Sequence, residues 1–153
     1  MREIQRKIAS ALIFSQDHKL LMGKKDAVKG GVYSDCWHIP GGGIDEDETL
    51  EQALKREVLE ETGIDISPYT IKPIPFIGSG LTEKTLKTGE KVMCQMEFNR
   101  FEINITDKKA GEISLHPTDD LVEMKWFSME DLLNIKHIPG GLDFLVEAGY
   151  IKK

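Results

Sequence analysis

The stretch GGIDEDETLEQALKREVLEETGI, at residues 42–64, decides the fold of this chain because it carries the clearest helix signal in the sequence. Thr49 and Gln52 match a capping box, in which each side chain binds the backbone N–H of the other residue. Gly63 can end a helix because glycine adopts the left-handed conformation at little cost. The spacing predicts a helix over Leu50–Thr62, with an apolar stripe that consists of Leu50, Ala53, Leu54 and Val58.

Three acidic residues continue this apolar stripe toward the C-terminal end of the predicted helix. At about 100° of rotation per residue, Glu57, Glu60 and Glu61 fall near the apolar positions and not on the opposite, solvated side. The C-terminal end of a helix is partially negative, and carboxylates three or four residues apart repel one another, so this arrangement is unfavourable by itself. A solvated acidic face is the ordinary interpretation of such a charge run. The position of these acids instead favours a bound cation, and oxygen ligands favour Mg²⁺ or Mn²⁺.

The same stretch resembles the Nudix box, G-x5-E-x7-R-E-U-x-E-E-x-G-U with U aliphatic, at every defined position from Gly42 to Ile64. A looser likeness extends to residues 37–41, 126–128 and 130–132. The resemblance to Nudix hydrolases of the MutT type implies an α/β fold, an α/β/α sandwich around a mixed β-sheet in which the box forms a loop, a helix and a loop. It also implies one domain over residues 1–153.

The resemblance assigns roles to residues of the box. The metal ligands of the family correspond to Glu57, Glu60 and Glu61, together with the backbone carbonyl of Gly41. Glu57, or another acid near the metal, would take a proton from the attacking water. Arg56 would orient a catalytic glutamate, although its spacing from Glu60 is also that of a surface ion pair. The implied catalytic residues are therefore Glu57, Arg56 and Glu60.

Weaker sequence signals support the candidate functional residues outside the helix. Lys24 and Glu123 resemble positions that contact substrate or contribute an acid in relatives, and a solvated strand residue is the alternative for each. Glu48 would either form an ion pair with the arginine of the box or interact favourably with the partially positive N-terminal end of the helix. We expect His38 to be structural, and the other downstream acids that could assist catalysis are Glu97, Glu102 and Glu112.

The rest of the chain predicts mostly strands. We expect a hairpin of residues 6–14 and 19–24, a loop over 27–35 and a short extended piece at 37–39. Further strands are expected at 74–78, 92–105 and 121–127, with a polar loop over 82–90. The alternation of apolar residues changes phase near Asn99 and Arg100, which predicts a bulge or break there. Ser128 is expected to cap a short helix, and residues 142–148 to form a terminal helix.

Composition excludes several classes of protein. The chain has 153 residues and a formal net charge of −6 at pH 7, so sequence-independent binding to a nucleic acid backbone is disfavoured. No apolar run approaches the ~20 residues that a membrane-spanning helix needs. Two cysteines without a C-x-x-C unit do not indicate a disulfide framework, so a cytoplasmic location is expected.

The resemblance to Nudix hydrolases, together with the acidic helix, implies a magnesium-dependent hydrolase. It would cleave the pyrophosphate linkage of a nucleoside diphosphate joined to another group, with a nucleoside triphosphate favoured, by attack of a metal-activated water on phosphorus. The partner would be a small nucleotide and not a nucleic acid or a membrane, and the resemblance leaves room for a homodimer. The alternative is a Nudix module that binds a nucleotide without turnover. An isoprenoid diphosphate isomerase is disfavoured because neither Cys36 nor Cys94 has the context of a catalytic cysteine.

Overall fold

The computed structural model describes residues 1–25, 35–117 and 121–152. Most of the loop expected over 27–35 lies outside these residues. The strands of the described chain are β1 (Arg2–Phe14), β2 (Leu20–Lys25), β3 (Trp37–His38), β4 (Gly41–Gly43), β5 (Ile71–Thr85), β6 (Lys91–Asn104) and β7 (Leu121–Phe127). The α-helices are α1 (Leu50–Thr62) and α2 (Gly141–Glu147), and the 3₁₀ helices are η1 (Ala110–Glu112) and η2 (Asp131–Asn134).

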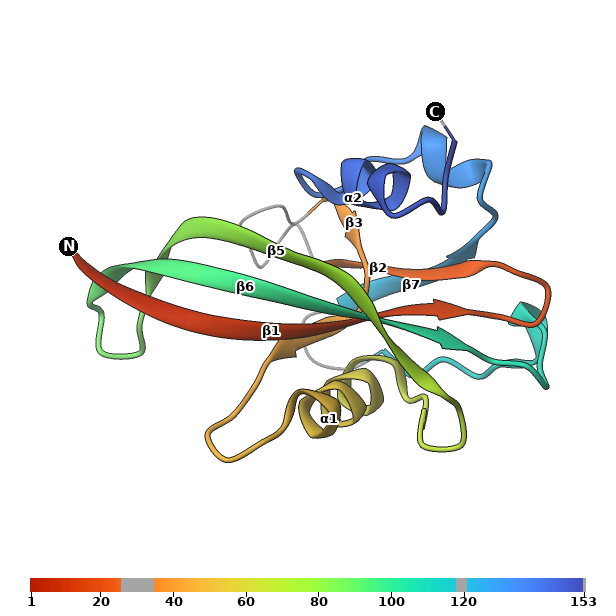
Figure 1. Cartoon of the computed structure of the whole chain (residues 1–153), viewed down its shortest axis with the longest axis horizontal. Helices are drawn as coiled ribbons and strands as arrows, with labels where there is room; N and C mark the ends of the chain where they lie inside the picture. The colour runs from red at the N-terminus through yellow and green to blue at the C-terminus, as the bar shows by residue number, and fades with distance from the viewer. Residues whose placement is uncertain (26–34, 118–120, 153) are drawn as a thin grey trace.

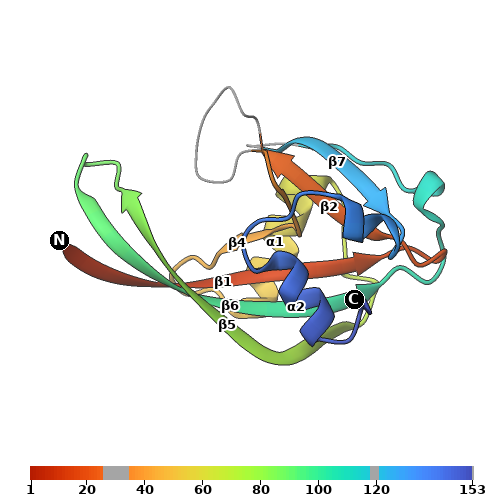
Figure 2. The ribbon, with the colours of Figure 1, turned by 90° about the horizontal axis from the view of Figure 1, so that it is seen from above.

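The strands form one mixed sheet between two helical layers. The main order is β3-β2-β1-β6-β5, with β4 beside β1 and β7 beside β2. β1 and β6 run parallel from the pair Arg2 and Val92 to the pair Phe14 and Asn104, and the other pairings are antiparallel. Helix α1 covers one face of the sheet, and α2 with the C-terminal segment covers the other (Figures 1 and 2). The predicted α/β/α sandwich around a mixed sheet is confirmed.

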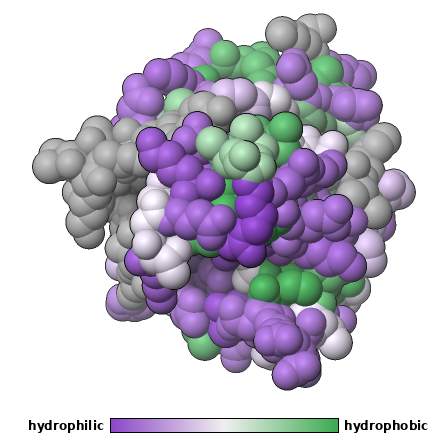
Figure 3. Space-filling model, turned by 90° about the vertical axis from the view of Figure 1, so that its left-hand side faces the viewer, coloured by the Kyte–Doolittle hydropathy of each residue, from purple (hydrophilic) through white to green (hydrophobic). Residues whose placement is uncertain are grey.

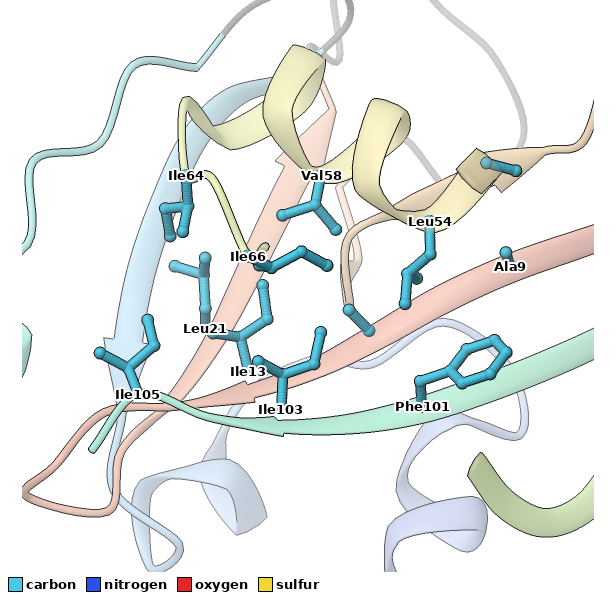
Figure 4. Close-up of a cluster of buried hydrophobic side chains, with 12 residues drawn as sticks. Ala9, Ile13, Leu21, Leu54, Val58, Ile64, Ile66, Phe101, Ile103 and Ile105 are labelled. Atoms are coloured by element: carbon cyan, nitrogen blue, oxygen red, sulfur yellow. The ribbon is translucent and has the colours of Figure 1, made fainter. Parts of the chain in front are cut away.

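Side-chain alternation along β1 supplies both hydrophobic cores. Ala9, Ala11 and Ile13 face α1, whereas Leu12 and Phe14 face α2 and the C-terminal segment. In the first core, Leu54 and Val58 of α1 point onto the strands (Figure 4). The members of that core are Ala9, Ala11, Ile13, Leu21, Ala53, Leu54, Val58, Ile64, Ile66, Phe101, Ile103 and Ile105. The two cores hold the helical layers against opposite faces of the sheet.

Three expectations about the strands are corrected. Strand β5 is longer than the predicted 74–78 and reaches Thr85, so the loop expected over 82–90 is reduced to residues 86–90. The polar residues at 82–85 belong to the strand because they pair with the start of β6. Strand β6 is unbroken at Asn99 and Arg100, and the register shift lies on β5 between Pro73 and Ile77.

The change of apolar phase along β6 has a different cause from the predicted break. Val92 and Cys94 are buried on one face of the strand, and Phe101 and Ile103 are buried on the other. One continuous strand therefore changes phase because different faces of it are covered at its two ends. The predicted hairpin of β1 and β2 is also limited to the pair Phe14 and Leu20, since β1 next pairs with β4 and β2 with β7.

The end of the molecule with the N-terminus and the β5–β6 turn extends beyond the helices (Figure 1) and has a largely hydrophilic surface with scattered hydrophobic patches (Figure 3). Neither α1 nor α2 nor any other described helix has the length and apolar character that a membrane crossing requires.

Candidate active site

Helix α1 is held at both ends by local interactions that the sequence predicts. The Thr49 hydroxyl accepts from Gln52 N at 3.1 Å, and the Gln52 side chain accepts from Thr49 N at 2.9 Å. At the other end, Gly63 has φ 81° and donates to the carbonyl of Leu59 at 2.9 Å. These caps set where the helix begins and ends, and therefore where its acidic residues stand against β4.

Arg56 joins the helix to the loop before it. Its Nε and Nη2 each donate to Glu48 at 2.8 Å, and Nη2 also donates to the carbonyl of Gly43 at 3.2 Å. Its Nη1 donates to Glu57 Oε1 at 2.9 Å and to Glu60 Oε2 at 3.4 Å. Two roles were expected for Glu48, and the structure shows the ion pair with Arg56. One guanidinium thus connects residues 43–48 with the last two turns of α1.

The charge pairing changes the protonation of both partners. Hydrogen bonds from Arg56 and from the backbone of Asp45 lower the pKa of Glu48 to about 2. The hydrogen bond to Glu48, with a further contribution from Glu57, raises the pKa of Arg56 above its ordinary value. Glu48 is therefore ionised, and Arg56 charged, throughout the physiological pH range.

Two of the predicted metal ligands lie directly against the glycine strand β4. Glu61 Oε1 accepts from the backbone N–H of Gly41 at 2.7 Å. The carboxylate of Glu57 stands so close to Gly42 that a Cβ there would lie 2.5 Å from its carboxyl carbon. Only glycine at position 42 leaves room for this carboxylate.

Glu60 shares Arg56 Nη1 with Glu57 but does not line the cleft that opens beside Glu57 and Glu61. Its side chain is 47% exposed and contacts Arg56, whereas the side chain of Glu57 is only 16% exposed. Within the described chain, no three His, Cys, Asp or Glu side chains form a ready-made metal cluster. The structure thus brings Glu57, Glu61 and Gly41 together, and it places Glu60 on the rim beside Arg56.

A cleft of about 1180 Å³ opens beside these residues. Helix α1 contributes Glu57 and Glu61, and β4 contributes Gly41–Gly43. Residues 138–141, directly before and at the start of α2, also line the cleft. The remaining lining includes Arg6, Ser10, His38, Lys84, Met96, Phe98, Arg100, Asp143, Phe144 and Glu147.

Several of these lining residues were not predicted from the sequence. Arg6 on β1 extends over Gly43, and Arg100 on β6 extends over Gly78, where a Cβ would lie 2.7 Å from Nη1. Each arginine is far from the box in sequence and has no motif around it. The parallel pairing of β1 with β6, which brings them onto one sheet, has no local sequence signal.

The predicted substrate residues Lys24 and Glu123 lie elsewhere. They are paired neighbours on β2 and β7, with Lys24 Nζ 3.8 Å from Glu123 Oε2. Lys24 Nζ also lies 5.3 Å from the ring centroid of Trp37. Neither residue lines the cleft that Glu57 and Glu61 share, and their role in substrate binding stays a prediction.

The other candidate acids do not line this cleft, and each accepts a hydrogen bond from another residue of the protein. Glu97 accepts from Asn99 at 3.0 Å, Glu102 from Tyr150 at 2.6 Å and Glu112 from the backbone of Lys109 at 2.9 Å. His38 does line the cleft, and its Nδ1 lies 2.9 Å from the carbonyl of Ile39.

Comparison with known proteins assigns the family. The family model described as the NUDIX domain matches residues 4–146. The chain belongs to the Nudix family. The prediction that it is a Nudix pyrophosphohydrolase is confirmed at the level of the family.

Two curated relatives and two solved structures illustrate the likeness. The nucleoside triphosphatase NudI of Escherichia coli K12 is 30% identical over 130 residues, which is 85% of this chain and 86% of the relative. An RNA pyrophosphohydrolase of a Wolbachia strain from Brugia malayi is 28% identical over 131 residues, 84% of this chain and 78% of the relative. The MutT protein of Methanosarcina mazei superposes with a TM-score of 0.67 at 22% identity, covering 97% of this chain and 95% of that one. The E. coli dihydroneopterin triphosphate pyrophosphohydrolase has a TM-score of 0.69 at 19% identity, with 92% of each chain covered.

Proposed function

We propose that this Nudix protein is a magnesium-dependent pyrophosphohydrolase that cleaves a nucleoside triphosphate to a monophosphate and pyrophosphate. The observation that carries the proposal is that two carboxylates and two arginines line one cleft. Glu57 and Glu61 stand against β4, and Arg6 and Arg100 line the same cleft. The carboxylates suit a divalent cation, and the arginines suit the anionic and polar groups of a nucleotide.

The oxygen donors at this site fit a hard cation. The carboxylates of Glu57 and Glu61 and the backbone of Gly41 are the groups that would hold Mg²⁺, with Glu60 as a further carboxylate on the rim. When bound, the ion would neutralise charge on the phosphates and make a water molecule more acidic. The glycine at position 42 keeps space in front of Glu57 for such a ligand.

The residues of this chain supply the positioning and the proton transfer. Arg56 holds Glu57 Oε1 at 2.9 Å, which orients that carboxylate toward the cleft. Glu57 would accept the proton of the attacking water while a new oxygen–phosphorus bond forms and the bond to the pyrophosphate leaving group breaks. Arg6, whose guanidinium lies over Gly43, would contact the phosphates.

A panel of nucleoside triphosphates with Mg²⁺ tests the proposal. We expect monophosphate and pyrophosphate from at least one of them, and a fall in kcat of about 100-fold or more in Glu57→Gln, because a general base contributes on this scale. Glu51→Gln is the matched control, since Glu51 is an exposed glutamate on the same helix that pairs with Lys55. Isothermal calorimetry with Mg²⁺ or Mn²⁺ should show weaker binding in Glu57→Gln than in the control.

Two results would contradict the proposal. Unchanged turnover in Glu57→Gln would remove the assigned base. Binding of nucleotides without turnover of any of them, at high protein concentration and with either metal, would instead support a Nudix module that binds without catalysis.

A further inference from the structure

Arg100 occupies an unusual position inside the cleft. Its guanidinium carbon lies 4.0 Å from the ring centroid of Phe144 and 5.4 Å from that of Phe98. No carboxylate of the described residues forms an ion pair with it, and burial alone lowers its pKa. A half-buried arginine that packs on aromatic rings keeps the N–H groups at its planar edge for another acceptor.

The sheet register places Arg100 in line with the end of the cleft that we propose for the phosphates. Arg100 pairs with Ser10 on β1, and Ser10 pairs with Gly41 on β4. Two strand spacings of about 4.8 Å therefore separate the backbone of Arg100 from that of Gly41. This separation is comparable with the span of a nucleotide from its phosphates to its base. A substrate with its pyrophosphate at Gly41 and Glu57 can extend its base toward Arg100.

The surroundings of Arg100 suit a base better than a phosphate. Phe98 and Phe144 are apolar and flat, and α2, which carries Phe144, lies over the strands in Figures 1 and 2. The same helix contributes Asp143 and Glu147 to the lining of the cleft. These two acids repel a polyphosphate chain, whereas they do not repel an uncharged base.

We infer that Arg100 is a specificity-determining residue that donates two parallel hydrogen bonds to the O6 and N7 atoms of a guanine base. Guanine fits because it presents two adjacent acceptors on one edge, which match the planar fork of an arginine. Adenine offers N7 beside an amino group, so it can accept only one of the two bonds. The inference rests on the proposed function, since it assigns the substrate of the same cleft.

Hydrolysis of GTP, ITP, 7-deaza-GTP and ATP by the wild type and by Arg100→Lys tests the inference. Lysine keeps the charge but loses the planar fork. We expect kcat/KM for GTP and for ITP, which keeps O6 and N7, to fall about 5- to 150-fold in Arg100→Lys, the range of one bidentate base contact. The value for ATP should change much less. In the wild type, 7-deaza-GTP should be a poorer substrate than GTP because it lacks N7.

Arg2→Lys is the matched control, because Arg2 lies on the neighbouring strand β1 of the same sheet but pairs with Glu90 outside the cleft. Equal losses for GTP and ATP in Arg100→Lys would overturn the inference, because they would place Arg100 on the phosphates. Equal wild-type rates for GTP and 7-deaza-GTP would also overturn it.

Calorimetric binding of GMP and AMP separates this inference from the proposed function, since it requires no turnover. A preference for GMP that Arg100→Lys abolishes would support base recognition even if no triphosphate were hydrolysed. Hydrolysis without any such preference would leave the proposed function standing and overturn the role of Arg100.

Discussion

At the scale of single residues, the paired charges of Glu48 and Arg56 hold the loop of the box onto its helix. The pKa of Glu48 is about 2 in the folded protein, compared with 4.5 for an ordinary glutamate. A lowered carboxyl pKa stabilises the folded state fully above about pH 4.5, and this stabilisation is lost as the pH falls toward 2. We therefore expect Glu48→Gln to lower the free energy of unfolding at pH 6 and to reduce the loss of stability between pH 5 and pH 2.

Urea unfolding at a series of pH values measures this difference. Glu51→Gln supplies the baseline, because it removes an exposed carboxylate three residues away, in the first turn of α1. If wild type and Glu48→Gln lost stability in parallel between pH 5 and pH 2, the ion pair with Arg56 would have no thermodynamic role.

At the scale of elements, α1 presents Glu57 and Glu61 to β4 only if the helix begins where its cap sets it. Thr49→Ala removes the acceptor for Gln52 N. We expect a loss of about 1 kcal/mol in the free energy of unfolding, the usual cost of a lost N-cap side chain. Equilibrium urea unfolding is the measurement, and Thr49→Ser is the control because serine keeps the hydroxyl. Equal destabilisation by both variants would indicate that the methyl group, and not the cap, matters.

At the scale of the whole molecule, the C-terminal segment closes the second core against the sheet. The hydroxyl of Tyr150 donates to Glu102 Oε1 on β6 at 2.6 Å, and its ring stacks on Phe14 at 5.5 Å between centroids. Tyr150→Phe should lower the free energy of unfolding by about 1 kcal/mol, the net value of one hydrogen bond. Burial, and then the hydrogen bond to Glu102, raise the pKa of Tyr150. This contribution is therefore complete below about pH 10 and is lost as the pH rises further.

Tyr69→Phe is the matched control, because Tyr69 donates to Asp107 in an exposed hydrogen bond at 2.8 Å. Thermal and urea unfolding measure the loss of stability in each variant at pH 7 and above pH 10. At pH 7, Tyr150→Phe should lose more stability than Tyr69→Phe. Above pH 10, the difference between the two variants should be smaller. An effect at Tyr69 as large as that at Tyr150 would contradict the role of burial.

The site was predictable where its chemistry is local in the sequence. The caps at Thr49 and Gly63, and the helix between them, follow from interactions over three or four residues. The prediction that Glu57 and Glu61 stand at the edge of the core follows from helical periodicity alone. Glu60 lies on the same helix but is half exposed, because the position of β4 and of Arg56, and not its azimuth, decides its contacts.

The sequence by itself therefore determined the acidic helix, through a short-range pattern of caps, spacing and charge. It determined the family and the sandwich through the resemblance of residues 42–64 to the Nudix box. Only the tertiary structure decided that Arg6, Arg100 and Phe144 share a cleft with that helix, and that the register shift lies on β5 and not on β6. The physical reason is that strand pairing joins residues nearly a hundred positions apart, as in the pair Ser10 and Arg100. Local propensity carries no information about such a register, which packing on both faces of the sheet selects.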